Sequence, residues 1–107
     1  MTDKLQIGRG AVVTACDLLG FLRTNAELES LLLEYGLDEH IRPGGSLEKT
    51  ALALKQFAVR NADLDVPTDY GQKELRQLLV DEAIRRVRWD SQTAAVWSKL
   101  ERYLNLD

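Results

Sequence analysis

Apolar residues recur at spacings of three and four along most of the chain. This spacing places them on one face of an α-helix, so it predicts amphipathic helices. No segment shows the alternation of apolar and polar residues that is typical of a strand. Five helices are predicted, over about residues 10–23, 25–35, 47–59, 70–89 and 92–104.

Residues that favour helix ends flank these segments. Thr24 and Glu27 form a capping-box pattern, in which each side chain accepts a hydrogen bond from a free backbone N–H. Gly36 is typical of the left-handed residue that ends a helix. The further N-cap candidates are Ser46, Asp69 and either Asp90 or Ser91.

A proline and two glycines precede Ser46, and this stretch raises the question of a phosphate-binding loop. Such a loop needs the pattern G-x-x-x-x-G-K-S/T after a strand. No strand is predicted here, and Lys49 would point away along the helix. The stretch is therefore predicted to be a turn, formed by Pro43, Gly44 and Gly45, in front of the N-cap Ser46. The N-terminus of the helix that follows could still accept a partner's carboxylate.

The predicted fold is all-α. Residues 37–41 add one short helical turn, and brief connections join the helices into a compact antiparallel bundle of five to six helices. Residues 1–107 form a single domain in this prediction. The segment at 70–89 carries the widest apolar arc, so it is expected to be the central helix, and Trp89 and Trp97 are expected to close the core between the last two helices.

The composition of the chain limits the classes of function that we expect. The chain has 107 residues, 45% of them hydrophobic and 29% charged, with a net charge of -3. We expect a soluble cytoplasmic protein, because the sequence shows no signal peptide and no apolar run near 18 residues. One cysteine, Cys16, and one histidine, His40, are too few for a zinc site. Cys16 is predicted to be a core residue and His40 a solvated loop residue.

The sequence provides no catalytic constellation. Its carboxylates are expected on helix surfaces and caps, and no acidic pair is expected on an apolar face where burial would shift a pKa. No Ser/His/Asp or Cys/His arrangement is recognisable. We therefore expect a protein that is not an enzyme and that takes no cofactor, metal or small-molecule substrate.

Charge is divided along the chain. Residues 25–48 contain six acidic residues and one basic residue, whereas residues 84–102 contain five basic and two acidic residues. One interpretation is an ordinary mixed surface, and the other is head-to-tail association through two faces of opposite charge. The candidate acidic interface is Glu27, Glu34, Asp38 and Glu39. The candidate basic interface is Arg85, Arg86, Arg88, Lys99 and Arg102.

The same basic cluster supports an alternative function. The run "RRVRW" offers arginines for phosphates and an aromatic residue for stacking on bases. Arg85 and Arg88 share a helix face in this prediction, and Arg86 is rotated away. The alternative is therefore a small helical regulator that binds nucleic acid, although the net negative charge argues against a general nucleic-acid binder.

Three successive stretches read "DLLGFL", "ELESLLLEYGLDEHI" and "PGGSLEKTALALKQFAVRNADL". Over about residues 16–85 this order resembles the death-fold adaptor domains, and most closely the bacterial effector-associated or caspase-recruitment-like domains. The matching positions are Leu28, Leu31, Leu32, Tyr35, Gly36, Leu37, Pro43, Gly44, Lys49, Leu52, Leu54, Phe57, Arg60 and Leu64. Arg60 stands three residues before Asp63, one more than the death-effector charge motif requires, so only the general mode of action is carried over.

The resemblance implies a recruitment module without catalysis. Such domains bind a like domain on another protein and bring an effector to it. In bacteria these effectors are proteases, nucleases, TIR domains or pore-forming proteins in defence against phage. The chain would then be either a free-standing adaptor or a segment of a longer effector protein.

Overall fold

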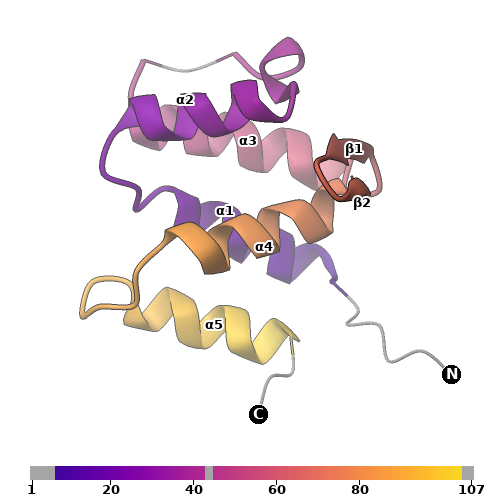
Figure 1. Ribbon diagram of the computed structural model, residues 1–107. Coiled ribbons are helices and arrows are strands. Elements are labelled where there is room, and N and C mark those ends of the chain that lie inside the picture. The colour runs from indigo at the N-terminus through magenta and orange to yellow at the C-terminus, as the bar shows by residue number, and fades with distance from the viewer. Residues whose placement is uncertain (1–6, 43–44, 105–107) are drawn as a thin grey trace, which may run out of the picture.

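The computed structural model describes residues 7–42 and 45–104. The elements of this part follow one another as α1 (Arg9–Leu19), α2 (Asn25–Glu34), the 3-10 turn η1 (Leu37–Glu39), α3 (Leu47–Arg60), β1 (Asp65–Thr68), β2 (Gly71–Glu74), α4 (Leu75–Arg86) and α5 (Ala94–Leu104). The chain is mostly helical and compact, with a radius of gyration of 13.1 Å. The prediction of a helical protein is confirmed at this level (Figure 1).

The central helix is α1. It packs against α3, α4 and α5, whereas α2 packs against α3 (Figure 1). Seven of its eleven residues are buried, and a helix buried on several sides is apolar around most of its circumference. The prediction that the segment at 70–89 is the central helix is therefore wrong. The small residues Ala11 and Ala15 are among the buried residues of α1.

Most of the predicted helix boundaries are confirmed. Thr24 accepts a hydrogen bond from the backbone N–H of Glu27, and Ser46 accepts one from the N–H of Lys49. Gly36 has a φ of 69°, the left-handed conformation that a helix end requires. The first helix ends at Leu19, four residues before its predicted end. Of the predicted turn before Ser46, Pro43 and Gly44 lie outside the described residues.

The segment between α3 and α4 holds an antiparallel hairpin, which corrects the all-α prediction. Asp65 pairs with Glu74, and Thr68 pairs with Gly71. Gly71 follows the two-residue turn with a φ of 102°, which a residue with a Cβ rarely adopts. Helix α4 begins only at Leu75, so the predicted start of this helix after Asp69 is wrong.

The hairpin is attached to the helices at its base. Backbone hydrogen bonds run from the N–H of Leu75 to the carbonyl of Leu64 and from the N–H of Arg76 to the carbonyl of Ala62. Val66 is buried in the core, and the partly buried Leu64 packs against the core. The turn at Asp69 and Tyr70 is thereby held beside α4. Among the helices of the described residues, none is long and apolar enough to cross a membrane.

Candidate interaction surface

A buried carboxylate organises the face between α2 and α4. Glu82 is only 3% exposed, and Arg85 and Arg86, from the next turn of α4, reach back to it. Nη2 of Arg85 lies 2.7 Å from Oε2 of Glu82, and Nε of Arg86 lies 2.5 Å from Oε1. A buried carboxylate needs such partners, because desolvation otherwise disfavours its charged form.

The prediction that the carboxylates lie on helix surfaces and caps is wrong for Glu82, which is buried. A signal for its burial exists, since Glu82 stands four residues after Leu78 and three after Leu79, both of which are buried. Helical spacing therefore places Glu82 on the core side of α4. The two arginines that follow it are the partners that a carboxylate in this position requires.

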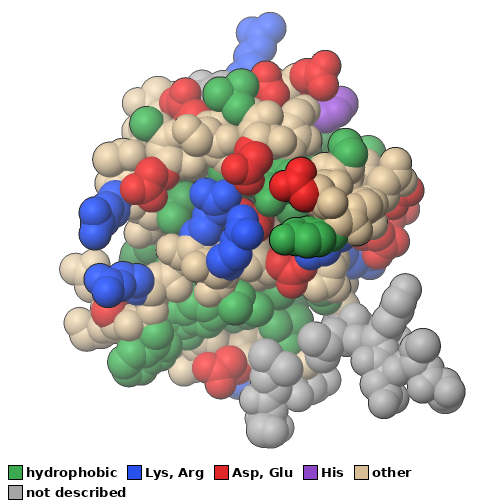
Figure 2. All heavy atoms as spheres, viewed as in Figure 1, with side chains coloured by type: hydrophobic (Ala, Val, Ile, Leu, Met, Phe, Trp, Pro, Cys, Tyr) green, Lys and Arg blue, Asp and Glu red, His purple; other side chains and the backbone are tan. Residues whose placement is uncertain are grey.

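The divided charges of the chain meet within one molecule. Nη2 of Arg86 lies 3.1 Å from Oε2 of Glu34, near the end of α2. The predicted acidic and basic interfaces therefore adjoin at this pair, and they do not form two wholly separate faces. Figure 2 shows Lys and Arg side chains between Asp and Glu side chains on the face that α2 and α4 present. Arg85 and Arg86 are committed to internal partners.

The remaining residues of the two predicted interfaces are exposed. On the acidic side these are Glu27, Asp38 and Glu39, and on the basic side they are Arg88, Lys99 and Arg102. Within residues 7–42 and 45–104, none of the three basic side chains has an ion-pair partner. Lys99 and Arg102 line a small hollow of about 260 Å³ together with Tyr103.

A braced turn after α4 presents an exposed tryptophan. Trp89 is 69% exposed, so its predicted place in the core is wrong, whereas Trp97 is half-buried against the core as predicted. The hydroxyl of Thr93 donates to the carbonyl of Arg88 at 2.8 Å and accepts from the N–H of Asp90 at 2.9 Å. These contacts fix the backbone on both sides of Trp89.

The carboxylate of Asp90 completes this turn. Its Oδ1 atom accepts hydrogen bonds from the backbone N–H groups of Gln92 at 2.8 Å and Thr93 at 3.0 Å. Because the N–H of Ala94 also donates to the carbonyl of Asp90, this residue caps the last helix, as predicted. Hydrogen bonds therefore brace the turn, whereas its tryptophan side chain is mostly exposed.

Apolar side chains are also exposed on α4 and α5. Ile84 of α4 and Tyr103 near the end of α5 are each about half exposed, and Figure 2 shows hydrophobic side chains gathered over α5 and its boundary with α4. On the other side, Phe21 shares a hollow of about 430 Å³ with Arg88 and Asp90. Aromatic residues and arginine are enriched at the few positions that contribute most of the binding free energy in protein interfaces.

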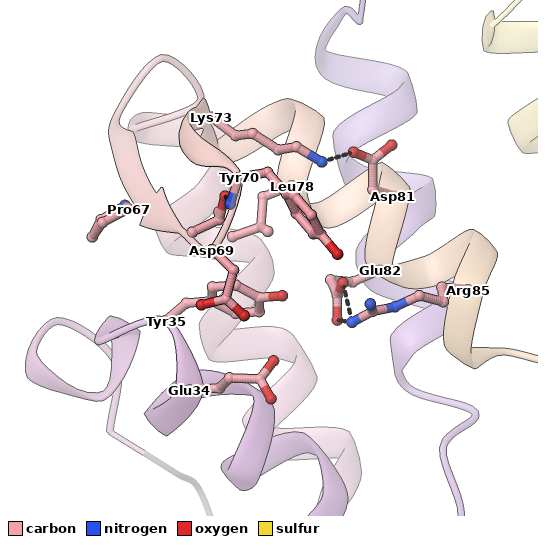
Figure 3. Close-up of a pocket in the computed structure, with 11 residues that line it drawn as sticks. Glu34, Tyr35, Pro67, Asp69, Tyr70, Lys73, Leu78, Asp81, Glu82 and Arg85 are labelled. Carbon is pink, nitrogen blue, oxygen red and sulfur yellow. Dashed lines mark hydrogen bonds and ion pairs between the residues drawn. The ribbon is translucent and has the colours of Figure 1, made fainter.

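A second feature is a cavity of about 540 Å³ between the end of α2, the hairpin turn and α4 (Figure 3). Tyr35, Tyr70 and Leu78 supply its apolar surface, and four carboxylates and two cations also line it. Nζ of Lys73 lies 2.7 Å from Oδ2 of Asp81. This volume falls within the range of about 300–1,000 Å³ that is usual for ligand pockets.

The electrostatics of this cavity follow from its carboxylates. Partial burial raises the pKa of the Tyr35 phenol, and the negative charges of Glu82 and Glu34 raise it further. The hydrogen bond to Glu82 raises the pKa of Arg85. Each shift has the sign expected near negative charge, because a carboxylate disfavours phenolate and favours guanidinium.

The two residues with the most reactive side chains stand apart from these surfaces. Cys16 is fully buried in α1, as predicted, and burial raises the pKa of its thiol to about 12. His40 is exposed and stacks on Phe57, with ring centroids 5.2 Å apart. Within the described residues, no group of three His, Cys, Asp or Glu side chains is placed to hold a metal ion.

The chain was compared with known protein families, curated proteins and solved structures. No family model, no curated protein and no solved structure matches this chain.

Proposed function

We propose that this chain is a recruitment domain that binds a like domain, either a second copy or a similar domain on another protein, and catalyses no reaction. The exposed side chain of Trp89 on its braced turn is the observation that carries the proposal. A rigid backbone lowers the entropy lost on binding, and a large exposed aromatic side chain gains most from burial. The death-fold resemblance of residues 16–85 adds the expectation of homotypic assembly in bacterial defence.

The charges around Trp89 suit a partner of mixed charge. Arg88 is exposed and unpaired among the described residues, and Glu27 lines the same hollow as Phe21 and Arg88. Exposed charges of this kind steer association and are screened by salt. The proposal therefore predicts an assembly that weakens as ionic strength rises.

The test is light scattering after size exclusion of the purified chain, at about 50 and about 500 mM salt, a range that spans weak to strong screening. We expect assemblies at low salt that dissociate at high salt. Arg88→Glu should weaken them, whereas Arg42→Glu, which makes the same charge change between η1 and α3, should not. A wild-type chain that is monomeric at both salts would contradict the homotypic form of the proposal.

A second candidate function follows from the same residue. Trp89 beside Arg88 resembles a platform on which a base of a single strand can stack. Arg85 and Arg86 count against this function, because their charges are compensated by Glu82 and Glu34. A mobility-shift experiment with single-stranded and duplex DNA at low salt separates the two functions, since only a nucleic-acid binder would shift the DNA.

A further inference from the structure

The cavity between α2, the hairpin and α4 has an excess of negative charge. Of its four carboxylates, Asp81 is paired with Lys73, and Glu82 is paired with Arg85. The two that remain are Glu34 and Asp69. Glu34 and Glu82 both pair with Arg86, which does not line the cavity. Asp69 has no ion pair or hydrogen bond within the described residues.

Two phenol rings border this negative cavity. Figure 3 shows Tyr35 and Tyr70 entering from different elements, with their hydroxyl ends directed toward Glu82. Tyr70 is 94% exposed at the hairpin turn, where Thr68 accepts a hydrogen bond from its backbone N–H. Aromatic faces next to carboxylates attract ammonium and guanidinium groups through both cation–π attraction and charge-assisted hydrogen bonds.

The complementary feature lies on α5. Lys99 and Arg102 are three residues apart, so they lie on one face of the helix, and both are exposed. Neither has an ion-pair partner within residues 7–42 and 45–104. Figure 1 places α5 and α2 at opposite ends of the molecule, with α1 between them. Within the described residues, none from α5 lines the cavity of its own chain, so its cations are free to meet the cavity of another.

We infer that the cavity of one chain receives the side chains of Lys99 and Arg102 from α5 of a second copy. This inference rests on the proposed homotypic function and deepens it. Because the donor and the acceptor surfaces are different, the contact is heterologous, and each added copy offers a free cavity at one end and a free α5 at the other. The assembly is then an open chain or a ring.

Two variants test this pairing. The cavity variant carries Asp69→Asn with Tyr70→Ala, and the α5 variant carries Lys99→Gln with Arg102→Gln. All four positions are exposed, and the changes leave Thr68, Gly71 and the buried residues of α5 in place. Circular dichroism and thermal unfolding confirm that each variant is folded. Arg42→Gln with Lys49→Gln is the matched control, because it removes two exposed cations elsewhere.

The variants are studied alone and mixed, by light scattering and sedimentation at about 50 mM salt, where screening is weak. Each variant alone should associate about tenfold or more weakly than the wild type, and the control should assemble like the wild type. An equimolar mixture should form a one-to-one dimer that does not grow, because only one intact cavity and one intact α5 can meet.

The outcomes separate this inference from the proposed function. If the wild type assembles but the mixture stays monomeric, or if either variant assembles as well as the wild type, the pairing of cavity and α5 is wrong while self-association stands. If the wild type itself is monomeric under the same conditions, the homotypic function fails, and the pairing fails with it.

Discussion

Arg86 and Glu34 form an ion pair across 52 positions of the sequence, with Nη2 of Arg86 3.1 Å from Oε2 of Glu34. The same guanidinium donates through Nε to the buried Glu82. One side chain therefore joins the end of α2 to α4 and also neutralises a carboxylate that is only 3% exposed.

Arg86→Met tests how much this contact contributes to the free energy of unfolding. The substitution keeps a long unbranched side chain but leaves Arg85 as the only cationic partner of Glu82 among the described residues. We expect the free energy of unfolding to fall by about 2 kcal/mol, less than for a fully orphaned buried charge, because one partner remains. Urea unfolding followed by circular dichroism gives this value.

The matched control for this prediction is Arg88→Met. Arg88 is exposed and has no ion pair within the described residues, so this change should alter the free energy of unfolding by no more than about 0.5 kcal/mol. Equal effects of the two substitutions would show that the pairing of Arg86 with Glu82 and Glu34 is not what stabilises this face.

Local signals in the sequence are enough to predict most of the helices. Thr24 and Ser46 cap their helices through hydrogen bonds to residues three positions ahead, so no knowledge of the fold is needed to find them. Leu28, Leu31 and Leu32 are buried for a similar reason, because their spacing alone defines one face of α2.

The hairpin was missed because its sequence pattern is weak. Seven of its eight strand residues are at least partly exposed, and only Val66 is buried, so apolar and polar positions do not alternate. The Thr68 to Gly71 turn was the available signal, since glycine after a short polar turn favours a hairpin. The helical spacing after Leu75 was instead extended backward over these residues.

The candidate sites depend on tertiary contacts and were predicted less well. Arg85 and Arg86 are predicted to be free cations when the spacing of Glu82 after the buried Leu78 and Leu79 is overlooked. The ion pair of Arg86 with Glu34 on α2 has no signal in the sequence, because it forms only when the helices pack. Trp89 is predicted to be a core residue because it is a large aromatic residue at the expected junction of the last two helices. Its exposure follows from the end of α4 at Arg86, which a periodicity argument does not locate.

Trp89→Ala should separate assembly from folding. Trp89 is mostly exposed, so its removal should change the free energy of unfolding by no more than about 0.5 kcal/mol. As an interface anchor, its truncation should weaken self-association by about 2 kcal/mol, or roughly thirtyfold. Sedimentation equilibrium of wild type and variant at low salt measures the difference.

Phe21→Ala provides a comparison for this experiment. Phe21 is 45% exposed beside the same turn, so a smaller loss of association is expected than for Trp89. Unchanged association in Trp89→Ala, with a folded chain, would remove this turn from the interface. Loss of folding in Trp89→Ala would contradict the exposed position itself.

Gly10 and Tyr103 mark a close approach of α1 and α5. A Cβ at Gly10 would lie 2.7 Å from Cδ1 and Cζ of Tyr103, well inside van der Waals contact. Alanine in place of glycine normally stabilises a helix interior by up to about 1 kcal/mol. Here overpacking should reverse the sign, so we expect Gly10→Ala to lower the free energy of unfolding by about 1 kcal/mol.

The double variant supplies the control. In a Tyr103→Ala background the ring is absent, so Gly10→Ala should stabilise the chain there by the usual helix preference. The difference between the two backgrounds, measured by urea unfolding as a double-mutant cycle, isolates the contact. The same effect of Gly10→Ala in both backgrounds would mean that α1 and α5 do not meet at this point.

Cys16 should make the stability of the chain depend on pH under alkaline conditions. Burial, with a smaller contribution from Asp17, raises the pKa of its thiol from 9.0 to about 12. Above pH 9 the unfolded chain releases the thiol proton while the folded chain keeps it, so the unfolded state is favoured as pH rises. The stabilisation is present in full below pH 9 and is lost progressively as the pH rises from 9 toward about 12.

The measurement is urea unfolding of wild type and Cys16→Ala between pH 8 and pH 10.5. The two proteins differ only at position 16, so the difference between their pH profiles isolates the contribution of the thiol. The wild-type free energy of unfolding should fall more steeply than that of the variant above pH 9. Parallel profiles would contradict the buried, protonated thiol, as would rapid labelling of Cys16 by a thiol reagent in the folded chain, because the thiolate is the reactive form.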